Sequence, residues 1–480
     1  MKSRLLPALL LTTGAGLLAA CDPPPGPGEE AEAVMVEDAT EVVTGRLFRS
    51  SDGSLIEEGV VVLAGERVAC SGEAGACQWP EETPVHPFPG STILPGLIDL
   101  HVHARPHYVG AFLSAGVTTI RDANNDLETV RALRSAEHAP RIFASGPLLD
   151  GPDAFFAQFP GSEPGHPARQ SLDRIMPVIV ENPEEARSAV AALADAGVDL
   201  IKLYEQIDPV AFRAAVDEAR EHGVPVAADI GTAFTRGLSG ATMDIVDAAE
   251  AGVTTVEHFS GLALAYQRRG GDPFDPELDE AVLDAIARAL VDSGTAFVPT
   301  VATPIQAEAP ETLALDDLPG LAGMEPHLEA GWAMARQMGE MGRDALQAEL
   351  RLVEALFGRL HEGGARIGAG SDLPAAPGMM PGWGLHQELE ALARMGMTPA
   401  EALRAATSVA AGILGDTSLG HLEPGAQADL VVVRGDPTSE ITATRQVEAV
   451  WFGGRAVDLD AGWSAVAEGF EAMAEAMRAP

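Results

Sequence analysis

The sequence predicts an α/β protein whose largest part is a TIM-like (β/α)8 barrel, with a small composite β-sandwich domain beside it. Short β-branched runs alternate with helical stretches between residues 92 and 374, which is the pattern of a parallel sheet built from strand–helix units. Eight such runs can be counted, and eight units are the number that closes a barrel. Both flanks of this region hold shorter strand patterns broken by glycines, and neither has enough strands for a stable sheet alone.

The N-terminus reads as an export signal. Residues 1–20 begin with Lys2 and Arg4 and continue as an apolar stretch, too short to span a membrane as a mature helix. The segment ends Leu-Ala-Ala before Cys21, which resembles a bacterial lipobox. We therefore expect an exported cell-envelope lipoprotein on the periplasmic face of the membrane, with a lipid anchor at Cys21. The alternative is an ordinary signal with an incidental cysteine.

A linker precedes the folded part. Residues 21–37 contain a run of prolines and paired glutamates, a composition typical of a tether rather than of a packed core. The formal net charge is −40, which argues against nucleic acid or anionic lipid as a partner because both are polyanions. We expect a small-molecule substrate, and homo-oligomerisation stays open.

The two flanks are expected to form the small β domain together. Residues 38–91 and 420–458 supply its strands. Cys70 and Cys77 are separated by six residues, enough for a turn that returns the chain. Because an exported protein meets oxidising conditions, we predict a disulfide between them, with free thiols as the alternative.

The barrel is expected over residues 92–419, followed by a terminal amphipathic helix over 459–480. Two connections, 146–182 and 301–361, are too long for plain loops, and such insertions usually form lids or substrate walls. The eight predicted strands are Ile93–His103, Gly116–Asp122, Arg141–Ser145, Val198–Tyr204, Val224–Asp229, Val253–His258, Ala296–Thr300 and Ala365–Ser371.

Ionisable residues gather at the carboxyl ends of these strands. His101 and His103 close the first strand, and residues two apart on a strand share a face, so both imidazoles can reach one metal. Asp229, His258 and Asp372 end or follow three other strands. Each of these residues alone is more typical of a cap or a buried polar group. Their shared position at the rim of a barrel predicts a common site.

Lys202 stands out because Lys2 and Lys202 are the only lysines among 31 basic residues. Removal of the signal would leave Lys202 as the single lysine. An amine can be deprotonated and become a nucleophile or a carbamate, whereas guanidinium stays protonated. Chance is the plain alternative, but Lys202 lies near the end of the fourth predicted strand, at the same rim.

The sequence as a whole resembles the metal-dependent amidohydrolase superfamily. The resemblance rests on the segments 94–103 (LPGLIDLHVH), 398–403 (TPAEAL) and 420–430 (GHLEPGAQADL). It covers nearly all of the predicted mature chain. The branch it most resembles contains imidazolonepropionase-like enzymes and the lysine-carboxylated dipeptidases that act on Xaa-Pro, Xaa-Arg or Xaa-Lys substrates.

The resemblance implies one or two divalent metals. His101, His103 and Asp372 would hold the first metal, and Lys202, N-carboxylated by carbon dioxide, would bridge to a second held also by His258. Zinc is the first expectation, with Mn, Fe or Ni as alternatives. Asp372 would move the proton of the attacking water.

One further catalytic role is expected at Tyr204. It lies two residues beyond Lys202, so the two side chains share a face of the strand. Tyr204 could donate a hydrogen bond to the developing oxyanion. Simple packing is the alternative for this residue.

Asp229 departs from the superfamily pattern, which has histidine at this position of the fifth strand. Three outcomes stay open. Asp229 ligates the second metal through oxygen; or the second site is weak or empty; or Asp229 pairs with an uncarboxylated Lys202 and removes the bridge.

The predicted function is hydrolysis of a C–N bond in a peptide, N-acyl amino acid or cyclic amide by a metal-activated hydroxide. Two alternatives remain. A metal hydroxide also attacks lactones, carbamates and phosphoesters, and only the pocket walls choose among them. The substitution at Asp229 could also have produced a ligand-binding lipoprotein without turnover.

Overall fold

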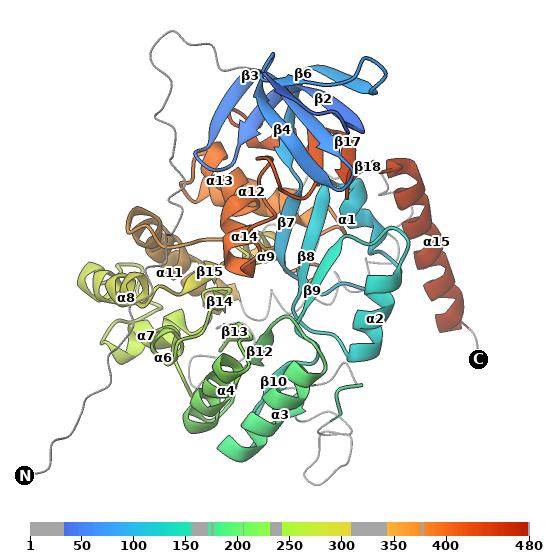
Figure 1. Cartoon of the computed structure of the whole chain (residues 1–480). Coiled ribbons are helices and arrows are strands. Elements are labelled where there is room, and N and C mark those ends of the chain that lie inside the picture. Colours follow the sequence, from blue (N-terminus) through green and yellow to red (C-terminus); the bar gives the residue numbers. More distant parts are fainter. Residues whose placement is uncertain are drawn as a thin grey trace, which may run out of the picture.

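A computed structural model gives the fold of the chain (Figure 1). It describes residues 33–154, 171–173, 177–204, 206–230, 242–308, 343–375 and 379–478. The predicted signal (1–20), most of the predicted tether (21–37) and Cys21 lie outside these residues. Within them, no helix is long and apolar enough to cross a membrane.

Strands from both flanks of the chain form one seven-stranded sheet, at the top of Figure 1. The antiparallel pairing of β6 with β16 joins the N-terminal strands to the C-terminal ones. In spatial order the strands are β18 (Arg455–Ala456), β17 (Val447–Phe452), β16 (Leu430–Arg434), β6 (Val85–Pro95), β2 (Glu41–Arg49), β3 (Ser54–Ala64) and β4 (Arg67–Glu73). This layering differs from the predicted β-sandwich, since the other sheet here has only two short strands, β1 (Val34–Met35) and β5 (Cys77–Gln78).

Side-chain alternation builds the interior of this domain. Val43 and Val61 pack in one apolar cluster, whereas their neighbours Val42 and Val60 pack in another, as the two-residue period of a strand requires. Both cysteines belong to the second cluster and form the predicted disulfide, with an S–S distance of 2.06 Å. The disulfide ties β5 to β4.

The central region contains two parallel sheets. One holds β7 (Leu97–Val102), β8 (Val117–Asp122) and β9 (Arg141–Ala144). The other has the spatial order β11 (Val178–Ile179), β10 (Leu149–Asp150), β12 (Ile201–Tyr204), β13 (Val226–Asp229), β14 (Thr255–Glu257) and β15 (Ala296–Val298). All pairs in both sheets are parallel.

The strand pairing therefore does not show the predicted closed sheet of eight strands. The eighth predicted strand, Ala365–Ser371, pairs through an isolated bridge between Ile367 and Phe297, and just beyond it Leu373 bridges to Val102. These bridges still connect the edges of the two parallel sheets. Gly370 allows this close approach, because a Cβ there would lie 2.5 Å from the Val298 side chain and 2.9 Å from the His101 Cβ.

The first predicted strand, Ile93–His103, is in fact two strands. Its beginning belongs to β6 in the small domain and the rest is β7, with Gly96 between them. Pro95 has no backbone N–H to donate to a sheet. A Cβ on Gly96 would lie 2.1 Å from Thr118 Oγ1, so only glycine lets the chain cross β8 here.

Helices cover the outside of the parallel sheets (Figure 1). Two of them begin at clear N-caps, because the Asn182 and Asp208 side chains accept backbone hydrogen bonds and a proline follows each. The helices are α1 (Gly110–Ser114), α2 (Leu127–Ser135), α3 (Pro183–Asp195), α4 (Pro209–Glu221), α6 (Ile245–Ala251), α7 (Leu262–Arg268), α8 (Glu280–Ser293), α9 (Ala302–Glu308), α11 (Arg343–Glu362), α12 (Gly384–Arg394), α13 (Pro399–Ala405), α14 (Ser408–Leu414), the 3-10 helix η4 (Ile441–Arg445) and α15 (Leu459–Arg478).

The two long connections contain structure of their own. The segment 146–182 contributes β10 and β11 to the six-stranded sheet, which its composition did not predict. The segment 301–361 contains α9 and most of α11. At the C-terminus, α15 packs on α1, where Ser114 Oγ donates to the Leu459 carbonyl at 3.0 Å.

Candidate metal centre

The predicted ligands come from several strands that end at the same side of the parallel sheets. His101 lies in β7, Lys202 in β12, and Asp229 is the last residue of β13. His258 directly follows β14, and Asp372 follows the segment that bridges β15 and β7. Because parallel strands present their carboxyl ends at one edge, residues distant in sequence meet there.

Three of these residues form a compact cluster. One ligand atom from each of His101, His258 and Asp372 lies within 4.8 Å of the others. Asp372 Oδ1 is 3.7 Å from His101 Nε2 and 3.2 Å from His103 Nε2. The two predicted first-metal histidines thus face the same carboxylate.

The side chains of Lys202 and Asp229 lie beside each other, and Asp229 also lies close to His258. Asp229 Oδ2 is 3.5 Å from His258 Nε2 and 3.9 Å from Lys202 Nζ. Both side chains are almost fully buried. Burial lowers the pKa of the Lys202 ammonium below its usual value, although Asp229 opposes this shift, and burial raises the pKa of Asp229 to about 6.

Three residues at the site have left-handed backbone conformations. The φ angles are 59° at His258, 48° at Thr300 and 55° at Asp372. Such angles cost about 1–3 kcal/mol each for residues with a Cβ and are typical of functional sites. Here they turn the chain at the strand ends, and the Asp372 N–H donates to the His101 carbonyl at 2.7 Å.

Two buried partners of the imidazoles were not identified from the sequence. Glu257 Oε2 lies 2.5 Å from His101 Nδ1, and Thr300 Oγ1 lies 2.6 Å from His258 Nδ1. Strand alternation was the available signal for Glu257, because it shares the inward face of β14 with Thr255. Thr300 gave no signal, since its position depends on the left-handed turn after β15.

Asp99 is another buried carboxylate that sequence reasoning passed over. It accepts hydrogen bonds from the Ser371 N–H at 2.9 Å and the Ser371 hydroxyl at 2.6 Å. Burial raises its pKa to about 7 against the opposing effect of these bonds. Asp99 therefore ties the strand of His101 to the loop of Asp372.

Tyr204 is half-buried beside Lys202. The Lys202 Nζ lies 6.0 Å from the centre of the Tyr204 ring, and Tyr204 pairs in register with Asp229. Tyr204 therefore lies near two of the proposed ligands, and its role in catalysis stays a prediction.

The residues present fit a divalent cation. Imidazole nitrogen and carboxylate oxygen are ligands that Zn, Mn, Fe and Ni accept. His101 Nε2 is buried and forms no hydrogen bond with any residue that the structure describes. A buried polar atom without a partner costs about 1–3 kcal/mol, which a bound cation would offset.

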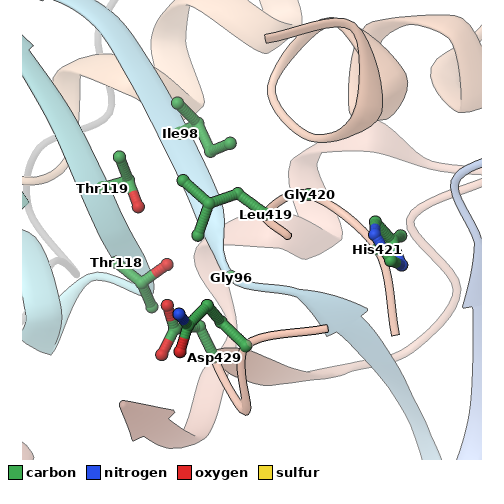
Figure 2. A pocket seen from close by; sticks show the side chains of 9 residues that line it. Gly96, Ile98, Thr118, Thr119, Leu419, Gly420, His421 and Asp429 are labelled. Carbon is green, nitrogen blue, oxygen red and sulfur yellow. The ribbon is translucent and has the colours of Figure 1, made fainter. Parts of the chain in front are cut away.

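A pocket at the other end of the strands does not belong to this centre (Figure 2). It lies where β7 and β8 begin, and its lining includes Gly96, Thr118 and Asp429. None of the predicted metal ligands lines it. Its walls join the small domain to the parallel sheets, so we assign it a structural role.

The fold and the cluster define an α/β protein with a histidine–aspartate centre at the carboxyl ends of parallel strands. The chain belongs to the amidohydrolase family, whose sequence profile matches residues 92–457. This match confirms the resemblance to the amidohydrolase superfamily. It does not test which branch of the superfamily the chain resembles most. No curated protein matches the chain.

Solved structures share the fold. A putative prolidase from Bifidobacterium longum is 25% identical with a TM-score of 0.61, and the match covers 90% of this chain and 100% of that one. A Xaa-Pro dipeptidase with bound methionine is 20% identical (TM-score 0.64, 87% and 99% covered). The A. niger ochratoxinase is 21% identical (TM-score 0.63, 88% and 96% covered). The fold is thus TIM-barrel-like α/β with a flanking domain.

Proposed function

We propose that this protein is a metal-dependent hydrolase that cleaves an amide or peptide C–N bond. The single observation that carries the proposal is the convergence of His101, His258 and Asp372 within 4.8 Å, in a chain of the amidohydrolase family. A bound divalent metal would supply Lewis-acid polarisation of the carbonyl and a lowered pKa of water. The remaining steps depend on the side chains of this chain.

The first metal would be held by His101, His103 and Asp372. Their arrangement around the Asp372 carboxylate supports this assignment. The nearby His258, Asp229 and Lys202 would hold a second metal, with Lys202 acting as an N-carboxylated bridging ligand. The burial of Lys202 supports carboxylation, since the reaction needs a neutral amine and burial lowers the pKa of the ammonium.

Asp372 would carry the proton during hydrolysis. Water adds to the carbonyl carbon, the C–N bond breaks, and the proton taken from that water must reach the leaving nitrogen. The nearby imidazoles and Lys202 favour the charged form of Asp372 and hold its pKa below the usual value despite burial. Its carboxylate would therefore be available as the base at neutral pH. Tyr204 would donate a hydrogen bond to the carbonyl oxygen.

The substrate class is suggested by the structural neighbours. These neighbours include a putative prolidase, a Xaa-Pro dipeptidase and an ochratoxinase. We propose a small substrate with an amide bond, either a dipeptide, an N-acyl amino acid or a cyclic amide. Zinc is the proposed metal, and Mn, Fe or Ni would suit the same ligands.

A substrate screen tests the function. Purified protein, loaded with Zn²⁺ or Mn²⁺ in parallel, is incubated with Xaa-Pro and other dipeptides, N-acyl amino acids and cyclic amides, and the released amine is quantified. We expect turnover that a chelator abolishes and that Asp372→Ala lacks. Absence of turnover on every substrate by metal-loaded protein would contradict the proposal and favour a ligand-binding role.

We also propose that the protein is anchored in the cell envelope through a lipid on Cys21. The support is the lipobox-like segment that ends at Cys21. Cell fractionation tests it. The wild type should sediment with membranes, whereas Cys21→Ser should be released or retained unprocessed. A wild-type protein found entirely in the soluble fraction would contradict the anchor.

A further inference from the structure

We propose that Glu257, clamped by Arg121, is a positioning residue that holds the proton of His101 on Nδ1 and leaves Nε2 free to bind the metal. Metal binding through Nε2 rests on the proposed function. The hydrogen bonds that place the proton on Nδ1 do not depend on that function.

The contact between Glu257 and His101 is short and fully buried. Glu257 Oε2 lies 2.5 Å from His101 Nδ1, and the exposure of both side chains is 0%. A carboxylate can only accept hydrogen bonds, so Nδ1 must donate to it. In the neutral imidazole, the other nitrogen then carries the lone pair. That nitrogen, Nε2, faces Asp372 and forms no hydrogen bond with a described residue.

Arg121 holds the Glu257 carboxylate in place through hydrogen bonds. Its Nη2 donates to both carboxylate oxygens at 2.8 Å. The Thr255 hydroxyl donates to Glu257 Oε1 at 2.5 Å, and Arg121 Nη1 donates to the same hydroxyl at 3.2 Å. With these donors around it, the carboxylate cannot rotate away from His101 without losing several buried hydrogen bonds.

The same arginine also holds the backbone of His101. Arg121 Nε donates to the carbonyl of Leu100, the residue before His101, at 2.5 Å. Arg121 therefore sets both the ring partner and the main chain of this histidine. Partners that orient a metal-binding imidazole typically change metal affinity about 10- to 100-fold when they are lost.

The alternative is a buried ion pair that only stabilises the fold. The chain offers a matched control for it, because Asp429 pairs with Arg141 at 3.1 Å and is buried in the small-domain junction. The Asp429 carboxylate accepts hydrogen bonds from Arg141 and from the Gly453 N–H. Among the described residues it accepts no hydrogen bond from a histidine. Loss of this pair removes a partly buried arginine–carboxylate contact without touching the metal centre.

The first experiment measures Zn²⁺ affinity by competition with a chromophoric chelator. Glu257→Gln should weaken Zn²⁺ binding about 10- to 100-fold, because a carboxamide can donate to Nδ1 and move the imidazole proton to Nε2. Glu257→Asp keeps the charge but is one methylene shorter, so it should also weaken Zn²⁺ binding. It tests the proposal if Glu257→Gln fails to fold. Asp429→Asn should bind Zn²⁺ as the wild type does. Glu257 variants within about twofold of the wild type would overturn the proposal.

The second experiment locates the proton directly in metal-free protein. Histidine is labelled with ¹⁵N in the ring, and the His101 signals are assigned by their absence in His101→Asn. We expect protonated Nδ1 and unprotonated Nε2 in the wild type and in Asp429→Asn, and the reverse in Glu257→Gln. Protonated Nε2 in the wild type would refute the proposal, whereas a wild type that binds no Zn²⁺ would refute the proposed function instead.

Discussion

At the scale of single residues, Lys202 carries the most specific chemistry. Its Nζ is buried and forms no hydrogen bond with the described residues, and its nearest acidic partner is Asp229 at 3.9 Å. Lys202→Arg keeps a positive charge but cannot form a carbamate. We expect kcat/KM to fall at least about 100-fold, which corresponds to about 3 kcal/mol of transition-state stabilisation.

The measurement is the rate of amide hydrolysis together with metal content. A short carboxylate such as acetate, added to Lys202→Ala, should restore part of the lost activity by replacing the bridging oxygens. Wild-type activity in Lys202→Arg would contradict carboxylation of the lysine.

Asp229 should determine which metal is preferred at the second site. An oxygen ligand favours harder cations such as Mn²⁺, whereas imidazole favours Zn²⁺. Asp229→His should therefore raise the selectivity for Zn²⁺ over Mn²⁺, by about tenfold or 1.4 kcal/mol. Competitive metal loading measured by mass spectrometry checks this. Unchanged selectivity would mean that Asp229 is not a ligand and acts only as the partner of Lys202.

The proposed metal ligands could be predicted from the sequence, but the residues that contact them could not all be. His101, His103, His258 and Asp372 could be predicted because each ends or follows a strand, and the structure brings them together. Strand alternation could place Glu257 on one face of β14 but could not show that it meets His101 Nδ1, and no sequence signal indicated that Thr300 meets His258 Nδ1. That geometry arises only when distant strands pack against each other.

At the scale of elements, Gly96 marks the point where the chain leaves the small domain. A Cβ would lie 2.1 Å from Thr118 Oγ1, so Gly96→Ala should force β7 and β8 apart. We expect a loss of about 1–3 kcal/mol in the free energy of unfolding, the usual cost of overpacking. Urea denaturation measures it.

A second glycine serves as the control for Gly96. Gly412 lies in α14 and has nothing within 4 Å of an added Cβ. Gly412→Ala should leave stability unchanged or raise it by up to about 1 kcal/mol, because alanine favours helices. Equal effects of the two substitutions would show that the contact with Thr118 is not what constrains position 96.

Glu388 in α12 should make stability depend on pH. It accepts hydrogen bonds from the Val301 and Ala302 N–H groups, yet burial raises its pKa from the ordinary value of 4.5 to about 8. The folded protein therefore holds this proton more tightly than the unfolded chain. The resulting stabilisation is complete below about pH 4.5 and is lost as the pH rises through about 8.

Comparison with Glu388→Gln isolates this effect. The free energy of unfolding of the wild type, relative to that of the variant, should decrease steadily between pH 5 and pH 9. Chemical denaturation at several pH values measures this difference. A difference that stays constant or increases over this range would contradict the raised pKa.

Elements with local signals could be predicted, and those defined by partners could not. The helices α3 and α4 begin at Asn182 and Asp208, each an N-cap followed by proline, which is a start signal contained in the local sequence. The strands β10 and β11 each have two residues, too few for a periodic pattern. Their identity comes from pairing with β12 and with each other.

At the scale of the whole molecule, the strand–helix alternation predicted the parallel α/β region correctly. The closure of the barrel could not be read from the same pattern, because it depends on the pairing of residues 365–373. In the structure these residues make bridges and backbone hydrogen bonds rather than a regular strand. The composite sheet of the flanks likewise depends on the long-range pairing of β6 with β16.

The metal content of the whole protein tests the central claim most directly. The protein is purified without added metal salts and analysed by inductively coupled plasma mass spectrometry, with Asp372→Ala in parallel. We expect about one to two equivalents of Zn, Mn, Fe or Ni per chain in the wild type, and a clear loss in the variant. Less than about 0.1 equivalent of these metals in folded wild-type protein, with none taken up when metal is supplied, would contradict the account.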